Sequence, residues 1–247
     1  MKKIILALAL TSTLFSCKKE TSTPNNSGNN TTDTTKTSNT TIGKPGPNIT
    51  DSEGNSYKTV TIGTQTWMAE NLKVSKYSDG TTIPNIIDNA QWSQLTTDAW
   101  SYYNNDAANN AKYGKLYNWY AVSKTTNGNK NVCPTGWHVP TDAEWKVLTD
   151  YLGGDSIAVG KLKEVGTTSW KSPNTGATNT SLFTGLPGGY RGSSGNDYSI
   201  GGSGNWWSST EGNALNAWYR TLTFNDGDAS RDDSGKGNGL SVRCLRD

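Results

Sequence analysis

The chain has 247 residues, and its 23 Lys and Arg against 21 Asp and Glu leave a formal net charge of +2. A charge this close to balance argues against a nucleic-acid partner, which usually needs a dense basic face. The sequence contains no internal repeat of fixed period, which argues against a repeat array.

The first 16 residues have the features of a signal peptide. Two lysines precede an apolar run at 4–10, which is well short of the roughly 20 residues that a membrane span needs. The sequence Leu-Phe-Ser-Cys that ends at Cys17 resembles the lipobox where bacterial lipoprotein precursors are cleaved and acylated. Lys18 follows instead of Asp, which by analogy with lipoprotein sorting favours the outer membrane. The domain would then face either the cell exterior or the periplasm.

Residues 17–48 are mostly Thr, Asn and Ser, and Ile42 is their only large apolar side chain. Such a segment cannot bury a core, so we expect a disordered tether whose acylated Cys17 holds the protein on the membrane. An adhesive or glycosylated stalk is the alternative to a plain spacer. All ten Trp and all eleven Tyr lie beyond residue 56, and residues 49–247 suffice for one domain with a substantial core.

Apolar alternation and turn residues predict four short strands in this domain, at 57–62, 65–68, 216–224 and 239–245. Along the predicted strand at 216–224, one face would carry Trp218, Leu222 and Phe224, and the other would carry Tyr219, Thr221 and Thr223. Segments rich in Gly, Ser and Asn predict long loops at 175–180, 185–204 and 226–239.

Three helices are predicted, at 114–122, after Thr141 and at 156–164. The second has the strongest local signals, because the hydroxyl of Thr141 can cap the first turn and Glu144 can complete a capping box. Its apolar residues recur at helical spacing, and two glycines follow it. For the third helix, Asp155 is the expected cap.

Two cysteines remain after Cys17, namely Cys133 and Cys244. An exported chain meets an oxidising environment, so this even remainder predicts one disulfide. A disulfide would remove the thiolate that a Cys–His catalytic pair requires. It would also leave too few ligands for zinc, since His138 is the only histidine in the chain. We therefore expect His138 to be structural.

Several motifs in a fixed order resemble the Fibrobacter succinogenes major paralogous domain, over about residues 57–247. They lie at 65–72, 113–119, 133–145, 207–210 and 241–247. That family is similar in turn to the formylglycine-generating, sulfatase-modifying group, a variant of the C-type-lectin-like fold. The resemblance implies an α+β domain with two or three short helices, small antiparallel sheets and long ordered loops. It also implies that the Cys133–Cys244 disulfide ties the start of the second helix to the last strand.

Formylglycine-generating enzymes use a cysteine pair near the C-terminal end of the domain, and here that region holds only Cys244. We therefore expect a domain without enzymatic activity. The alternatives are a structural or adhesin component that has no discrete small ligand, and a degenerate oxidase of the formylglycine-generating type.

The expected binding surface is a C-terminal stretch that mixes aromatic contact area with hydrogen-bonding side chains, as antibody binding loops do. Its ligand would be an extracellular carbohydrate or a protein. The alternative is that the tryptophans are buried in the core. The C-terminal stretch also resembles that of C-type-lectin-like lipoproteins diversified by retroelements, which allows its loops to be hypervariable. The candidate residues are Trp207, Asn213, Asn216, Tyr219, Thr221, Thr223, Asn225, Asp226, Asp228 and Arg231.

No cofactor is expected from the sequence, and calcium is the one metal that the loop at 226–233 allows. Its Asp and Ser side chains stand at alternate positions, but the loop lacks the glycine and the final glutamate of an EF-hand. The simpler interpretation is a solvated acidic loop whose charges pair with Arg231 and Lys236.

Overall fold

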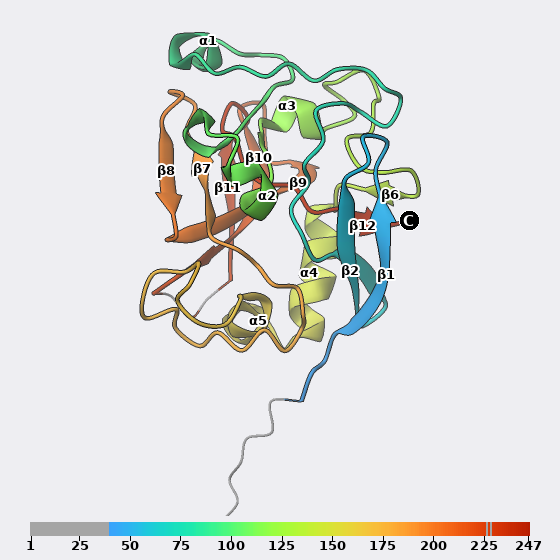
Figure 1. The fold of residues 1–247 in the computed structure, drawn as a ribbon, viewed down its shortest axis with the longest axis vertical. Coiled ribbons are helices and arrows are strands. Elements are labelled where there is room, and N and C mark those ends of the chain that lie inside the picture. Colours follow the sequence, from blue (N-terminus) through green and yellow to red (C-terminus); the bar gives the residue numbers. More distant parts are fainter. Residues whose placement is uncertain (1–39, 226, 228) are drawn as a thin grey trace, which may run out of the picture. The chain divides into compact units, whose positions relative to one another are not determined.

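A computed structural model of the chain describes residues 40–247 except 226 and 228 (Figure 1). The predicted signal peptide, the lipidation site Cys17 and most of the predicted tether lie outside the described residues. Within the part that is described, no helix has the length and apolar character needed to cross a membrane.

The first sheet has five antiparallel strands in the order β1-β2-β3-β12-β6. The two predicted strands at 57–62 and 65–68 are confirmed as β2 and β3, which are joined by a turn at Gly63 with φ +61. β1 was not expected, because its residues lie largely in the predicted tether. The strands are β1 (Lys44–Thr50), β2 (Ser56–Ile62), β3 (Gln65–Met68), β6 (Trp137–His138) and β12 (Leu245–Arg246).

The second sheet also has five strands, in the order β11-β10-β9-β7-β8, and only the β7–β9 pair is parallel. The strand predicted at 216–224 is confirmed as β10. The loops predicted at 185–204 and 226–239 are wrong in part, because they contain β7, β8, the start of β9 and β11. The strands are β7 (Gly188–Arg191), β8 (Asp197–Ile200), β9 (Ser203–Glu211), β10 (Asn216–Thr223) and β11 (Ser230–Gly235).

Short elements connect the two sheets, including a two-stranded sheet of β4 and β5. The helix predicted at 114–122 is wrong in its first half: Gly114 has φ +73, β5 follows it, and only α3 is helical. The elements are α1 (Asn89–Ser93), β4 (Trp100–Ser101), a 3-10 turn (Tyr103–Asn105), α2 (Asn109–Tyr113), β5 (Leu116–Tyr117) and α3 (Trp119–Val122).

The helix predicted after Thr141 is confirmed as α4 (Asp142–Tyr151), with the complete capping box of Thr141 and Glu144. α5 (Asp155–Leu162) follows after Gly153 and Gly154, both at positive φ. The predicted cap at Asp155 is wrong, since Gly154 is the N-cap and Asp155 already belongs to the first turn.

α4 lies between the two sheets in Figure 1 and closes one of two cores. Its Trp145 packs at 4.7 Å, centroid to centroid, on Trp67 of β3, and Phe183 links both rings to Trp206 of β9. The second core surrounds Tyr117, Trp119 and Trp207 and includes both cysteines. These cores give the α+β domain a continuous interior between its sheets.

The last segment of the chain joins both sheets. The strand predicted at 239–245 is wrong over most of its length, because only β12 is a regular strand there. Residues 239–241 instead make single bridges to Arg191, Tyr117 and Trp206. The predicted disulfide is present between Cys133 and Cys244, which are 111 residues apart in sequence.

Candidate functional site

The second sheet presents two chemically different faces along β10. Tyr219, Thr221 and Thr223 stand opposite Trp207, Asn205 and Ser203 of β9, so these six side chains share one face. Arg220 and Leu222 alternate with them and stand opposite Trp206 and Gly204. The predicted division of this strand into a polar face and an apolar face is confirmed, with a buried arginine added to the apolar face.

Trp207 is not available to a ligand, because its side chain is 0% exposed. Its indole Nε1 donates a hydrogen bond to the carbonyl oxygen of Tyr117, and its ring meets that of Tyr219 edge to face at 6.2 Å. The prediction of Trp207 as a ligand-binding residue is therefore wrong. The alternative, a tryptophan buried in the core, is the arrangement observed.

Asn213 and Asn216 shape the turn between β9 and β10. The Asn213 side-chain oxygen accepts hydrogen bonds from the backbone amides of Leu215 and Asn216. The Asn216 side chain donates to the Asp233 carboxylate at 2.9 Å. Both asparagines thus have partners within the protein.

The remaining candidates lie near the β10–β11 connection. Asn225 is exposed there. Asp226 and Asp228 lie outside the described residues. Within the described ones no group of three acidic, histidine or cysteine side chains is close enough to share a metal ion.

Arg231 of β11 lies on the opposite face from Tyr219, since its register partner is Arg220. Its guanidinium stacks on the ring of Trp218 at 3.4 Å from the centroid, and its Nε–H is shared between the two oxygens of the Asp142 carboxylate, each at 3.0 Å. The ten predicted residues therefore do not form one surface, and Arg231 belongs to a separate charged cluster.

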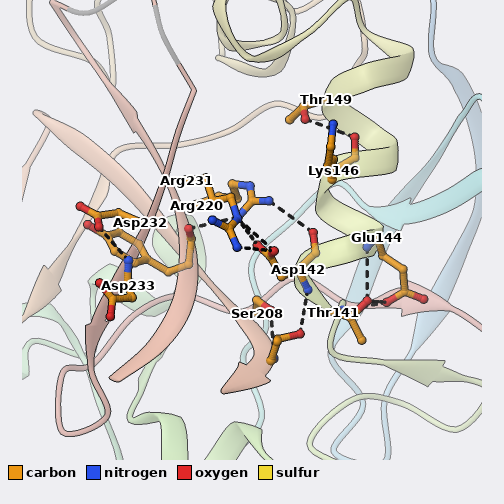
Figure 2. Close-up of polar contacts among 12 residues, drawn as sticks. Thr141, Asp142, Glu144, Lys146, Thr149, Ser208, Arg220, Arg231, Asp232 and Asp233 are labelled. Carbon is orange, nitrogen blue, oxygen red and sulfur yellow. Dashed lines mark hydrogen bonds and ion pairs between the residues drawn. The ribbon is translucent and has the colours of Figure 1, made fainter. Parts of the chain in front are cut away.

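That cluster is centred on Asp142, the first residue of α4, as Figure 2 shows. Arg220, which is 4% exposed, donates to the same carboxylate at 2.7 Å. Burial alone would raise the pKa of Asp142, but hydrogen bonds from Arg231 and Arg220 and their positive charges outweigh it and hold that pKa below its ordinary value. The cluster fastens the β10–β11 hairpin to the start of α4.

His138 of β6 lies between two carboxylates. Its Nδ1 is 2.6 Å from Asp247 Oδ1, and its Nε2 is 3.0 Å from Glu144 Oε1. Both ring nitrogens are therefore occupied by acidic partners, and Cys133, the nearest nucleophile in sequence, is in the disulfide. This geometry links the capping box of α4 to β6 and β12, and it leaves no ring nitrogen free to act as a general base.

Two tyrosines, Tyr190 of β7 and Tyr198 of β8, extend the polar face of β10. The rings of Tyr190 and Tyr198 stack at 5.4 Å, and Tyr198 is 43% exposed. Gly189 of β7 pairs with Gly204 of β9, so the next residues, Tyr190 and Asn205, lie on the same face of the sheet as Thr221. Burial raises the pKa of Tyr219. We call the set Tyr190, Tyr198, Tyr219, Thr221 and Thr223 the tyrosine face. Sequence reasoning missed its first two members because they were assigned to a loop.

The structure is therefore an α+β domain with two buried cores, an internal disulfide and a partly exposed sheet face that carries tyrosine and threonine side chains. The family model of the Fibrobacter succinogenes major domain matches residues 60–246. The chain therefore belongs to that family. No curated protein and no solved structure matches the chain.

Proposed function

We propose that the protein is a lipid-anchored outer-membrane or cell-surface protein without enzymatic activity, whose C-type-lectin-like domain binds an extracellular carbohydrate or protein through the tyrosine face. The lipobox that ends at Cys17 supports the anchor. The resemblance to the formylglycine-generating group supports the C-type-lectin-like assignment within the α+β class.

The observation that carries the binding role is the exposed part of the second sheet. Tyrosines supply rigid contact area at low entropic cost, and the hydroxyl of Thr221 adds a hydrogen-bonding group beside them, whereas that of Thr223 is buried. Tyr198 is 43% exposed, and Tyr219, Thr221 and Thr223 are half-buried with their backbone fixed in β10. A ligand that contacts this face therefore orders few groups when it binds, which limits the entropic cost of binding.

The absence of enzymatic activity is supported by the state of the candidate catalytic groups. Cys133 and Cys244 are bonded to each other, so neither offers a thiolate. If both cysteines were found as reactive thiols in protein from its native envelope, the alternative of a formylglycine-generating-type oxidase would again have the two thiols that its chemistry needs.

The binding role is tested by screening the chain from Lys18 onward on glycan arrays and against surface proteins of its own cells. We expect a Tyr190→Ala/Tyr198→Ala double variant to lose at least about tenfold in affinity, since such rigid aromatic contacts dominate binding surfaces. Tyr151→Ala is the matched control, because Tyr151 is a 57% exposed tyrosine on α4, away from the tyrosine face.

Equal binding by the double variant and the wild type would rule out the tyrosine face as the ligand surface. Absence of any ligand in both screens would favour the structural or adhesin role. The anchor is tested separately, by mass spectrometry of membrane fractions from wild-type and Cys17→Ser cells. Only the wild-type chain should carry acyl groups and remain with the membrane.

A further inference from the structure

A cavity of about 590 Å³ lies at the other side of the domain, between the β1–β2 ribbon, α2 and the segment 182–186. None of the tyrosine-face residues lines it. Cavities that hold small ligands in proteins are typically of this size, with mostly apolar walls and a few convergent polar groups. The accessible apolar part of this wall includes Ala69, Leu182 and Leu186, and Val60 lies buried beneath it.

The wall at 182–186 is held in place from behind by Arg243. This buried guanidinium donates hydrogen bonds to the carbonyl oxygens of Phe183 and Thr184. Leu182 and Thr184 have φ of +57 and +54, a left-handed conformation that costs free energy in residues with a side chain. The surrounding contacts hold these two residues in that conformation, so the cavity wall is formed before any ligand arrives.

One carboxylate on this wall lacks a partner. Glu164 Oε2 is buried without a hydrogen-bond donor, and Glu164 is in none of the ion pairs among the described residues. Glu70, the other acidic residue of the cavity, differs: it accepts a hydrogen bond from the Lys58 amide at 2.7 Å and pairs with Lys73 at 3.7 Å. A buried acceptor left without a donor is costly, and Glu164 as a whole is only half-buried. A cationic donor in the cavity would therefore be favoured once the Glu164 side chain turns its Oε2 toward it.

Two lysines line the same cavity, and neither forms an ion pair with a carboxylate of the described residues. They are Lys58 and Lys112, and both are exposed. The cavity thus combines one unpaired anion, two unpaired cations and an apolar wall. A ligand that carries both charges and an apolar body complements all three.

We propose that this cavity binds a short zwitterionic peptide with apolar side chains. Its terminal ammonium group lies at Glu164, its carboxylate lies toward Lys58 and Lys112, and its apolar side chains lie on Leu182 and Leu186. This site is separate from the tyrosine face, and it holds whether or not that face binds a ligand.

The test is an NMR titration of the isotope-labelled chain from Lys18 to Asp247 with leucyl-alanyl-leucine and with its N-acetylated and C-amidated forms. We expect saturable shifts of residues around the cavity with the free peptide, and weaker binding of each blocked form. Glu164→Gln should weaken the free peptide about tenfold, because a hydrogen bond to a charged group is lost. The same variant should bind the acetylated form as the wild type does.

Glu211→Gln and Lys171→Met are the matched controls, since neither residue lines the cavity, and both should bind as the wild type does. Lys58→Met/Lys112→Met should weaken the free peptide and leave the amidated form unaffected. If the wild type shows no saturable shifts with any of the three peptides, the proposal is wrong. It is also wrong if the acetylated peptide binds as tightly as the free one, or if Glu164→Gln binds the free peptide normally.

Discussion

Asp142 has a role that its position at the start of a surface helix does not suggest. Its side chain is 17% exposed and accepts hydrogen bonds from Arg220 and Arg231, so it neutralises a guanidinium that is almost completely buried. The cluster therefore keeps Arg220 in the interior beside Leu222. Without the carboxylate, that buried charge would have no anionic partner among the residues that the structure describes.

We expect Asp142→Asn to lower the free energy of unfolding by about 3 kcal/mol, since removal of one partner leaves a buried charge uncompensated. Chemical denaturation followed by tryptophan fluorescence measures this change. Asp150→Asn is the control, because it removes only the exposed pair with Lys146, whose contribution is at most about 1 kcal/mol. Equal losses in the two variants would contradict the role given to Asp142.

The same carboxylate makes a pH prediction. The pKa of Asp142 is held below its ordinary value of 3.8, so its stabilising contribution is complete above that pH and is lost as the pH falls through the lower folded-state pKa. The wild type should therefore lose stability below about pH 4 more steeply than Asp142→Asn does. Unfolding midpoints measured from pH 6 to pH 2 test this, and parallel curves would count against it.

At the residue scale, sequence reasoning identified part of the candidate site. The alternation along 216–224 correctly placed Tyr219, Thr221 and Thr223 on one face, because strand periodicity is a local property. The structure adds Arg220 to the apolar face beside Leu222, and its partner Asp142 is 78 residues away in sequence, so no local pattern points to that pair. Trp207 was wrongly predicted to contact a ligand. Its burial depends on which distant segments pack against its strand, and the local sequence does not show this.

At the element scale, the part of the chain with complete local signals was predicted best. α4 has its cap, its capping box, its apolar spacing and its terminal glycines within 14 residues of sequence, 141–154. β7, β8 and β11 are short strands rich in Gly, Ser and Asp whose stability comes from pairing with neighbours. Strand propensity depends strongly on such context, so their sequences indicate loops.

The capping box of α4 is open to a direct test. Thr141→Ala should lower the free energy of unfolding by about 1 kcal/mol, because the helix loses a hydrogen bond to its first turn and Glu144 loses a donor. Thr135→Ala is a suitable control, since Thr135 is exposed and precedes the helix. Calorimetric midpoints of the two variants should differ, and identical midpoints would show that the cap is dispensable.

β1 leads to a prediction about where the domain begins. It pairs with β2 from Lys44 to Thr50, and Ile42 and Ile49 pack on the two cores. A chain that starts at residue 51 should lose about 3 kcal/mol of stability from the two isoleucines and aggregate through the uncovered edge of β2. A chain that starts at residue 40 is the control and should behave as the full chain. Light scattering and urea unfolding distinguish the two.

At the scale of the whole molecule, the disulfide closes a loop over 111 residues of sequence that includes α4, α5 and the entire second sheet. A Cys133→Ala/Cys244→Ala variant should lose about 4–5 kcal/mol, mainly because its unfolded chain is less constrained. Urea unfolding of the wild type with reducing agent should match that of the variant. A difference below about 1 kcal/mol between oxidised and reduced protein would contradict this account of the loop.

Residues 239–245 are all buried inside the fold. They bridge β7 and β9, pair with β3 and β6, and carry Cys244 and the buried Arg243. A nascent chain therefore lacks an essential part of both cores until the ribosome has passed residue 246. Chains that stop short of these residues should therefore complete neither core and should remain sensitive to proteases.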